Sequence, residues 1–364
     1  MTFSTSDYQQ QLEQKHQQTL AEFAEFGVNT IDVFPSPTQQ YRMRAEFKAW
    51  HSTAGVSYAM FEAGSRKAYD VETFPAGSAA IQALMPRLRD YLNIDEILRH
   101  KLFQIEFLTS TKGESLISLI YHKPLDERWR AAAQSAARHL QTRVIGRSRG
   151  QKLVLTEDFI YESFEVAGKT YQYQQLEGSF TQPNGNVCRD MLNWAADNSV
   201  GFGGDLLELY CGNGNFTLPL SRNFNKVLAT EVAKSSIHSA LYNCALNHIT
   251  NVTFVRMSAE DMVGALDKVR AYERLKDVDL DGYDFSTVFV DPPRSGLDPL
   301  TNTFVSRFDN IVYISCNPLT LKENVQQLYQ THRVERMALF DQFPYTEHRE
   351  CGVILRRRGI NFPR

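Results

Sequence analysis

The C-terminal half of the chain alternates short apolar runs with helical segments, and this alternation strongly limits the possible folds. Strands that alternate with helices predict a doubly wound parallel sheet with helices on both of its faces. Sheets of this kind bind their ligands at the carboxyl ends of the strands, so functional residues are expected directly after the runs. The five runs that predict buried strands are 206–209, 226–230, 252–256, 287–290 and 310–314.

The N-terminal half has a different pattern, in which strands follow one another and the helices are set apart. This arrangement is typical of an α+β domain. We therefore predict two domains, residues 1–175 and 176–364, with the boundary between residues 165 and 185. The predicted helices are 8–26, 78–99 and 125–141, and the predicted strands include 44–50, 56–61, 102–108 and 115–121.

Composition excludes several classes of protein. The net charge of the 364 residues is −3, so a nucleic-acid surface would have to be a local patch. The first residues lack a basic segment followed by an apolar one, and no apolar run approaches the ~18 residues that span a bilayer. We expect a cytoplasmic protein that does not act at a membrane, and nothing indicates an obligate protein partner.

The five cysteines are scattered and form no Cys-x-x-Cys pair, so we expect no metal site, no iron–sulfur cluster and no disulfide. Four of them are expected to be small, buried and inert thiols. The exception is Cys316, which has a local context of its own. The cysteines are Cys188, Cys211, Cys244, Cys316 and Cys351.

Cys316 lies between a predicted strand, 310–314, and a predicted helix, 319–329. Asn317 is a favourable N-cap residue, and Pro318 suits the first helical position. The positive end of the helix dipole favours a thiolate. We therefore predict a reactive thiolate near neutral pH, placed at the carboxyl edge of the sheet.

A glycine turn follows the strand that ends at residue 209. Gly212 and Gly214 allow the backbone to pass close to a ligand, and Glu231 ends the next strand nineteen residues after Gly212. A carboxylate at that position can accept hydrogen bonds from both ribose hydroxyls of an adenine nucleotide. The pattern suits a dinucleotide or S-adenosylmethionine, although Thr217 replaces the third glycine of a dinucleotide site. A plain tight turn with a surface glutamate is the alternative.

Asp291 follows another apolar strand and begins the motif Asp-Pro-Pro-Arg. The two prolines stiffen the backbone, and a residue that precedes proline is held extended. Asp291 could contact a cofactor or hold a flat polar substrate. The alternative is a stiff connecting turn without a ligand.

Taken together, the motifs resemble those of the RNA 5-methyluridine methyltransferases, and within them the tRNA (uracil-5-)-methyltransferase branch. The resemblance covers nearly the whole chain. Ribosomal-RNA branches of this family typically carry an additional β-barrel domain, a four-cysteine iron–sulfur cluster, or both, whereas this chain begins with a predicted helix and has no cysteine before Cys188. The matching segments are 209–216 (LYCGNGNF), 291–297 (DPPRSGL), 315–318 (SCNP), 348–351 (HREC), 41–47 (YRMRAEF) and 100–104 (HKLFQ).

The resemblance implies a class I (Rossmann-like) S-adenosylmethionine methyltransferase domain preceded by an α+β RNA-binding domain. It implies methylation of C5 of the T-loop uridine at tRNA position 54, giving 5-methyluridine, and action on tRNA-like T-loops such as that of tmRNA. It also implies that the last strand of the sheet, 352–355, runs antiparallel to the others.

Residue by residue, the resemblance makes Cys316 the nucleophile that attacks C6 of uracil, which forms a covalent adduct and activates C5. It makes Glu350 the base that then removes the C5 proton. Asp291 is assigned to the cofactor, and its position also allows a contact to the uracil edge. The implied contacts to S-adenosylmethionine are Gln182, Tyr210, Asn215, Glu231 and Asp291.

Two basic segments are candidates for RNA contact. Residues 128–152 contain seven Lys or Arg and no Asp or Glu, which makes this block the best candidate for phosphate contact. Residues 41–44, with Lys48, Trp50 and His51, combine basic and aromatic side chains that suit looped RNA. A uracil folded into a T-loop must be flipped out of its stack to reach a thiol.

Three alternatives remain at this point. A 23S ribosomal-RNA uridine-C5 methyltransferase would use the same chemistry. An NAD-dependent dehydrogenase would explain the glycine turn but would leave Cys316, Asp291 and Glu350 without a role. An RNA chaperone with a vestigial cofactor fold would not require the nucleophile and the base to be intact.

Overall fold

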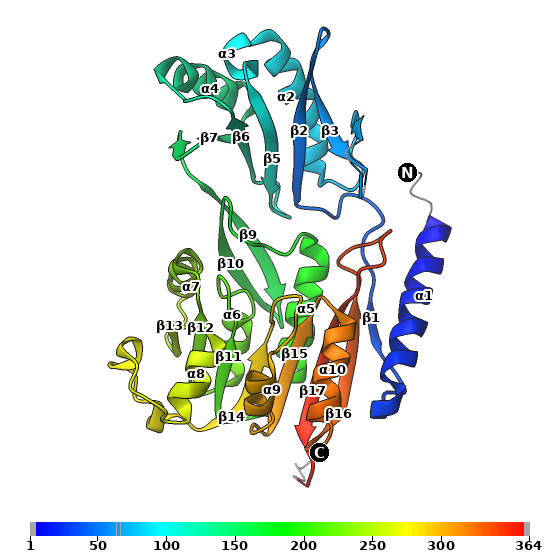
Figure 1. Cartoon of the computed structure of the whole chain (residues 1–364), viewed down its shortest axis with the longest axis vertical. Coiled ribbons are helices and arrows are strands. Elements are labelled where there is room, and N and C mark those ends of the chain that lie inside the picture. Colours follow the sequence, from blue (N-terminus) through cyan, green and yellow to red (C-terminus); the bar gives the residue numbers. More distant parts are fainter. Residues whose placement is uncertain (1–4, 63, 66, 360–364) are drawn as a thin grey trace. The chain divides into compact units, whose positions relative to one another are not determined.

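The computed structural model describes residues 5–62, 64–65 and 67–359 (Figure 1). Contacts within the chain divide it into two compact units. The first unit contains the described residues up to Ser36, the segment Phe164–Tyr173, and the chain from Asn186 onward. The second unit contains Pro37–Ser163 and Gln174–Gly185.

This division differs from the predicted domains 1–175 and 176–364, because the N-terminal helix belongs with the C-terminal sheet. The predicted helix 8–26 is α1 (Thr5–Phe23), which continues into a 3-10 turn at Ala24–Phe26. Strand β1 (Asp32–Phe34) then pairs in parallel with β16 (His332–Phe340). A pairing across some three hundred residues leaves no local signal, so the sequence pattern placed this segment in the wrong unit.

The first unit is built on an eight-stranded sheet with the order β1-β16-β17-β15-β14-β11-β12-β13. The five predicted strands are present and pair in parallel, which confirms the doubly wound arrangement. The last strand, β17, is antiparallel to both of its neighbours, as the family resemblance implied. The remaining strands are β11 (Asp205–Leu209), β12 (Val227–Glu231), β13 (Val252–Arg256), β14 (Phe285–Val290), β15 (Asn310–Ser315) and β17 (Glu350–Arg357).

Helices cover both faces of this sheet (Figure 1) because its strands are apolar on both sides. Leu207 and Leu209 point into one core with α1, α8, α9 and α10, whereas Leu206 points into the other with α5, α6 and α7. These helices are α5 (Gly185–Asn198), α6 (Thr217–Leu220), α7 (Lys234–Leu246), α8 (Ala259–Leu266), α9 (Pro299–Val305) and α10 (Pro318–Leu328). Short 3-10 turns lie at Ser221–Asn223, Glu273–Leu275 and Leu280–Gly282.

The second unit contains a seven-stranded sheet with the order β4-β3-β2-β5-β6-β7-β8. Its neighbours are antiparallel except for β6 and β7, which α4 connects in parallel. The main apolar core lies between one face of the sheet and its helices, which confirms the α+β prediction, and a small second cluster of Leu108, Leu116, Ile145 and Ile160 is buried apart from it. Its elements are β2 (Arg44–Ser52), β3 (Gly55–Phe61), β4 (Ala68–Asp70), α2 (Ala79–Ile94), α3 (Glu96–Arg99), β5 (Leu102–Thr109), β6 (Ser115–Tyr121), α4 (Glu127–Leu140), β7 (Arg143–Ser148) and β8 (Gln151–Val154).

Strands β9 (Phe159–Val166) and β10 (Lys169–Leu176) form a separate hairpin. The part of the hairpin around its turn packs in the core of the first unit, and the outer ends of both strands belong to the second unit. Across the described part of the chain, no helix combines the length and the apolar character that crossing a membrane requires.

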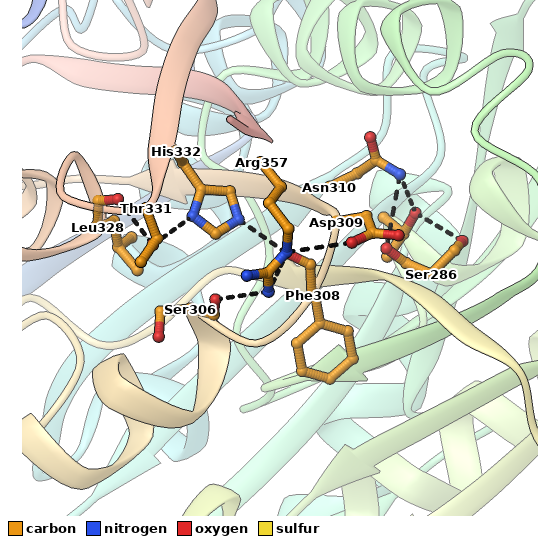
Figure 2. A network of polar contacts seen from close by, with 10 residues as sticks. Ser286, Ser306, Phe308, Asp309, Asn310, Leu328, Thr331, His332 and Arg357 are labelled. Atoms are coloured by element: carbon orange, nitrogen blue, oxygen red, sulfur yellow. Dashed lines mark hydrogen bonds and ion pairs between the residues drawn. The ribbon is translucent and has the colours of Figure 1, made fainter. Parts of the chain in front are cut away.

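Polar side chains at the amino ends of the parallel strands are paired with one another, as Figure 2 shows. Arg357, at the end of β17, donates to Asp309 Oδ1 at 3.1 Å and to the carbonyl of Ser306 at 2.9 Å. His332 Nε2 lies 2.7 Å from the carbonyl oxygen of Phe308, and burial lowers the pKa of this imidazole. At the same edge, Asp205 accepts the backbone N–H groups of Lys226 and Asp284 at 2.9 and 2.7 Å. We call Asp205, Asp309, His332 and Arg357 the polar edge.

Candidate active site at the carboxyl edge of the sheet

Strand register aligns three of the predicted site residues. Leu209 in β11 is paired with Thr230 in β12 and with Val290 in β14. Tyr210, Glu231 and Asp291 are the next residues on these three strands. They therefore leave the sheet side by side at its carboxyl edge, where a doubly wound sheet binds its ligand.

Cys316 and Glu350 lie at the same edge of the sheet, at the ends of β15 and β17, the next two strands beyond β14 in the sheet order. The antiparallel ladder between β15 and β17 ends at the pair Ser315 and Cys351. The next residue outward is Cys316 on one strand and Glu350 on the other, so both emerge together at the end of the ladder. The charges of Glu350 and Asp291 both reach the Cys316 thiol, which shows that the three groups lie in one site.

The strand–helix junction around Cys316 has the predicted form. The side chain of Asn317 accepts a hydrogen bond from the Leu319 N–H at 3.2 Å and caps α10, which begins at Pro318. The hydroxyl of Ser315 accepts the Asn317 N–H at 3.2 Å and fixes the turn between strand and helix. Cys316 is partly exposed, whereas the other four cysteines are buried as predicted.

The predicted low pKa of Cys316 is wrong for this structure. Burial, followed by the charges of Glu350 and Asp291, raises the pKa of the thiol to about 11, and the nearby Arg294 offsets only part of this shift. The helix N-terminus was the reason to expect a thiolate near pH 7. Partial burial beside two carboxyl groups outweighs it, because both effects disfavour a second negative charge.

The carboxyl groups at this edge hold their protons more tightly than ordinary acids. Burial and then the charge of Asp291 raise the pKa of Glu350 well above its usual range, and burial raises the pKa of Asp291 to about 7. A cluster of this kind favours a cationic ligand, which would relieve the repulsion between the acids. Within the described residues, no group of three or more His, Cys, Asp or Glu side chains is arranged to hold a metal ion.

Hydrogen bonds hold the Asp-Pro-Pro-Arg loop against the helix that follows Cys316. Asn317 Nδ2 donates to the Arg294 carbonyl at 3.0 Å, and Asn324 accepts the Leu297 N–H at 3.0 Å while donating to the Leu297 carbonyl at 3.1 Å. Gly296 has a φ of +75°, and a Cβ there would approach Asn324 Oδ1 to 2.8 Å. The loop that begins at Asp291 is therefore fixed relative to α10 and Cys316.

The glycine turn is closed by the predicted ribose-binding acid. Glu231 accepts the N–H of Gly212 at 3.1 Å and the N–H of Ala233 at 2.8 Å, so its carboxylate is held against the turn. Gly212 has a φ of +55°, and Tyr210 has a φ of +64°, which is unusual for a residue with a side chain. Backbone strain of this kind concentrates at functional sites. The turn has the geometry expected of a nucleotide-binding loop.

Asn215 is oriented from outside the turn. Its side-chain nitrogen Nδ2 lies 3.5 Å from the sulfur of Cys188 in α5. Its backbone carbonyl accepts a hydrogen bond from the hydroxyl of Tyr173 at 3.0 Å. Asn243 Nδ2 donates to the Asn213 carbonyl at 3.0 Å. Two helices and a strand therefore hold this predicted cofactor residue in place.

Glu208 is a site residue that the sequence analysis missed. It lies within β11 and is 1% exposed, and burial raises its pKa to about 8, with a further contribution from Asp291. Its Oε2 atom has no hydrogen-bond partner in the described part of the chain. The available signal is a single acid inside the apolar run 206–209.

Gln182 is not among the residues that this edge brings together. It lies in the loop before α5, within the second unit. The other four predicted cofactor residues all lie in the first unit. A contact from Gln182 to the cofactor therefore stays a prediction.

The basic block 128–152 is less available for RNA than its sequence indicated. Arg143 pairs with Glu114 and Glu157, and Arg147 and Lys152 both pair with Glu177. In addition, Arg130 lies 3.3 Å from Glu127, and Lys152 lies 2.7 Å from Asp158. The block contains no acid, but the fold brings acids to it from elsewhere. The exposed members are Arg128, Arg138, Arg149 and Lys152, and of these Lys152 is paired with acids.

Of the second basic segment, Lys48 and Trp50 lie on the sheet face of the second unit that is opposite its main apolar core, whereas Tyr41 and Met43 are buried. Along β2, Lys48 and Trp50 point to this face while Phe47 points into the core. Lys48 Nζ lies 3.9 Å from the ring centroid of Phe103, and the ring of His122 lies 4.1 Å from the same ring. Trp50 and Phe103 are 49% and 37% exposed, so they are available to stack on bases.

The family of the chain follows from comparison with known proteins. The model of the tRNA (uracil-5-)-methyltransferase family matches residues 7–358. The chain belongs to this family. The match includes the glycine turn, the Asp-Pro-Pro-Arg loop, the Cys316 junction and the start of β17, so the family extends over the complete carboxyl edge described above.

Similar proteins agree with this family over nearly their whole length. A protein of Saccharophagus degradans named tRNA/tmRNA (uracil-C(5))-methyltransferase is 55% identical over 97% of each chain. One of the same name from Cellvibrio japonicus is 54% identical over 98% of this chain and 97% of its own. The crystal structure of Pyrococcus abyssi tRNA (uracil-54, C5)-methyltransferase in complex with S-adenosyl-L-homocysteine superposes with a TM-score of 0.73 at 21% identity, over 96% of this chain and 83% of that one. This likeness confirms the methyltransferase fold.

Proposed function

We propose that this chain transfers a methyl group from S-adenosylmethionine to C5 of the T-loop uridine at position 54 of tRNA, and of the equivalent T-loop of tmRNA. The observation that carries the proposal is the end of the β15–β17 ladder, where Cys316 and Glu350 emerge together beside Asp291. Relatives at 55% and 54% identity that are named tRNA/tmRNA (uracil-C(5))-methyltransferase support the choice of substrate.

Cys316 supplies the nucleophile in this proposal. C5 of uracil is a poor nucleophile, and attack of the thiolate on C6 converts the base into an enolate whose negative charge makes C5 reactive. The new bond joins Sγ to C6, and the electron pair of the C5–C6 double bond becomes available to take up the methyl group. The bond between that methyl group and the sulfonium would break at the same time, with its electron pair remaining on the sulfur of the neutral thioether that leaves. The raised pKa of Cys316 means that its proton must leave before attack. The same raised pKa makes the thiolate, once formed, a stronger nucleophile.

Glu350 supplies the base that completes the reaction. After methylation C5 carries both a methyl group and a hydrogen, and removal of that proton re-forms the C5–C6 double bond as the C6–S bond breaks. The electron pair of the broken bond returns to the thiolate of Cys316, so the enzyme is regenerated. Because its pKa is raised, the ionised carboxylate of Glu350 is a stronger base than an ordinary glutamate.

The carboxyl edge fits S-adenosylmethionine, which supplies the methyl group from a positively charged sulfonium. The fit rests on the raised pKa values of Glu208 and Asp291, two acids that a nearby cation would stabilise in their ionised forms. Glu231, held against the glycine turn, is oriented to accept the ribose hydroxyls. Tyr210, Asn215, Asp291 and Gln182 complete the proposed set of cofactor contacts.

The exposed sheet face of the second unit is the proposed RNA surface. Its exposed rings, Trp50 and Phe103, can stack on the splayed bases of an opened loop, and Lys48 can contact phosphate. The target uracil must leave the T-loop stack to reach Cys316, and stacking on such rings would offset part of the unstacking free energy. Of the basic block, Arg128, Arg138 and Arg149 remain as phosphate contacts.

The proposal is tested by incubating the protein with unmodified tRNA and methyl-labelled S-adenosylmethionine and then mapping 5-methyluridine in the product. We expect label at T-loop position 54, and Cys316→Ala should yield neither product nor a denaturant-stable protein–RNA adduct. Ribosomal RNA is tested in parallel, because label there and not in tRNA would favour the 23S alternative. An adduct that persists in Cys316→Ala would exclude this residue as the nucleophile.

A further inference from the structure

Helix α1 presents a row of polar side chains to the segment that leads into Glu350. Lys15, Thr19 and Glu22 are spaced four and three residues apart, which places them on one face of the helix. All three bond to side chains of the segment 341–349, which connects β16 to β17, or to one another. We call these contacts the α1 latch.

The first contact of the α1 latch is a fully buried ion pair. Lys15 Nζ donates to Asp341 Oδ1 at 2.7 Å and to the carbonyl oxygen of Phe343 at 3.0 Å. Lys15 is 3% exposed and Asp341 is 0% exposed. Burying two charges is costly, so a pair of this kind adds little net stability, and fixing one particular arrangement is the benefit that can justify it. The start of the connecting segment is therefore held at one place on α1.

The second contact holds the residue directly before Glu350. Arg349 donates from one terminal nitrogen to Glu22 Oε2 at 2.8 Å and to Thr19 Oγ1 at 2.9 Å, and from the other to Glu22 Oε1 at 3.0 Å. This bidentate geometry fixes both the distance and the orientation of the guanidinium group. Thr19 in turn donates to the Lys15 carbonyl at 2.7 Å, so the two contacts of the α1 latch share a residue.

Both neighbours of Glu350 are therefore anchored on the α1 side of the sheet. Arg349 is held by Glu22, and Cys351 is buried in the same core cluster as Phe23 of α1. Side chains alternate along a strand, so Glu350 is directed away from α1. The position of its carboxyl group relative to Cys316 depends on how firmly its two neighbours are held.

We propose that the α1 latch is a positioning device for Glu350, with Glu22 and Arg349 as the positioning residues. The inference rests on the proposed function, because it assigns the latch to the step in which Glu350 removes the C5 proton. Cys316 is held independently, through the cap of α10 and the Asn317–Arg294 contact. Weakening the latch should therefore slow release of the covalent adduct and leave its formation unchanged.

The experiment compares Glu22→Gln with a control in the 3-10 turn that continues α1, Ala24–Phe26. Glu22→Gln removes the charge that pairs with Arg349 and keeps the shape of the side chain. The control is Glu25→Gln, because Glu25 pairs at 2.7 Å with Lys322 of α10 and not with Arg349. For each protein, single-turnover reactions with tRNA and S-adenosylmethionine are quenched in denaturant, and the covalent adduct and the methylated product are quantified over time.

We expect Glu22→Gln to lower the rate of product formation by about 10- to 100-fold, the cost of a small misplacement of a reacting group. The adduct should form at the wild-type rate and accumulate, and Glu25→Gln should match the wild type in both rates. Equal slowing of formation and release, or a similar defect in Glu25→Gln, would overturn the latch in favour of a general structural role.

Two further controls distinguish a failure of the proposed function from a failure of the α1 latch. A wild-type protein that forms no adduct at all would contradict the proposed function, whereas a wild-type adduct that Glu22→Gln does not prolong would contradict the latch alone. Thermal unfolding reports whether Glu22→Gln is folded. Glu22→Asp keeps the charge on a shorter side chain, so it covers the case in which Glu22→Gln does not fold. Its adduct should be released at an intermediate rate, and release at the wild-type rate would also count against the latch.

Discussion

The two edges of the eight-stranded sheet hold their acids in different surroundings. At the polar edge, Asp205 accepts two backbone N–H groups and Asp309 pairs with Arg357 (Figure 2). At the carboxyl edge, burial raises the pKa of Asp291 to about 7 and that of Glu208 to about 8. The difference lies in the surroundings of each carboxyl group and not in the type of residue.

The comparison shows how to separate structural from functional acids in one sheet. A carboxylate that accepts backbone N–H groups satisfies those donors and in turn fixes the chain around it. A buried carboxyl group that lacks such donors reduces stability at neutral pH. Such a group is retained where a bound ligand supplies the positive charge or the hydrogen-bond donors that the fold does not. Substitutions at the two edges should therefore act on different quantities, stability at one and reaction rate at the other.

Glu350→Gln should produce the largest change at the carboxyl edge. Loss of the general base is expected to lower the rate of product release by about 10²- to 10⁴-fold. The adduct through Cys316 should still form, because the thiol is unchanged. Quenched single-turnover assays measure both rates, and urea unfolding of the variant should show no loss of stability. Release at the wild-type rate would exclude Glu350 as the base.

Alkylation of Cys316 should depend steeply on pH. Because the pKa of the thiol is raised to about 11, the reactive thiolate is scarce at pH 7. The rate of reaction with iodoacetamide should rise about tenfold per pH unit below that pKa. Mass spectrometry identifies the modified residue, with Cys316→Ser as the control. A rate that has already levelled off at pH 8 would contradict the effect of the neighbouring carboxyls, and Asp291→Asn should shift the profile to lower pH.

Asp205→Ala tests the polar edge. The change leaves the partly buried N–H groups of Lys226 and Asp284 without their side-chain acceptor, and we expect the free energy of unfolding to fall by about 2 kcal/mol. Urea unfolding measures this loss. The protein that remains folded should form and release the adduct at nearly wild-type rates, since the site lies at the other edge. A large fall in those rates at unchanged stability would break the distinction between the two edges.

Glu208→Gln should have the smallest effect on the reaction rate, and it should also change how stability depends on pH. The pKa of Glu208 is raised in the folded state, from 4.5 to about 8, so folding favours its protonated form. Its contribution to stability is therefore full below about pH 4.5 and is lost as the pH rises through 8. Removing the group should flatten the pH dependence of stability by on the order of 4 kcal/mol between pH 5 and pH 8. Urea unfolding at both pH values checks this, and an unchanged slope would contradict the unpaired burial of Glu208.

Local patterns in the sequence predicted much of the carboxyl edge. The alternation of apolar runs and helices predicted the parallel strands, and the pair Asn317–Pro318 predicted the cap of α10. Capping, glycine turns and strand periodicity depend on residues a few positions apart, so the sequence alone determines them. The position of Cys316 follows from residues a few positions away and was predicted correctly. Its pKa depends on groups that are distant in the sequence and was not.

Only the tertiary structure decided the quantities that depend on distant neighbours. The pairing of β1 with β16 moved α1 into the first unit, and Glu177 came from outside the basic block to pair with Arg147. The pKa of Cys316 is raised first because the fold partly buries the thiol, and then because Glu350 and Asp291, from two other strands, lie near it. Desolvation and charge–charge interactions depend on distance in space, which the order of residues in the chain does not specify. The sequence by itself determined which groups could react, and the fold decided how tightly each one holds its proton.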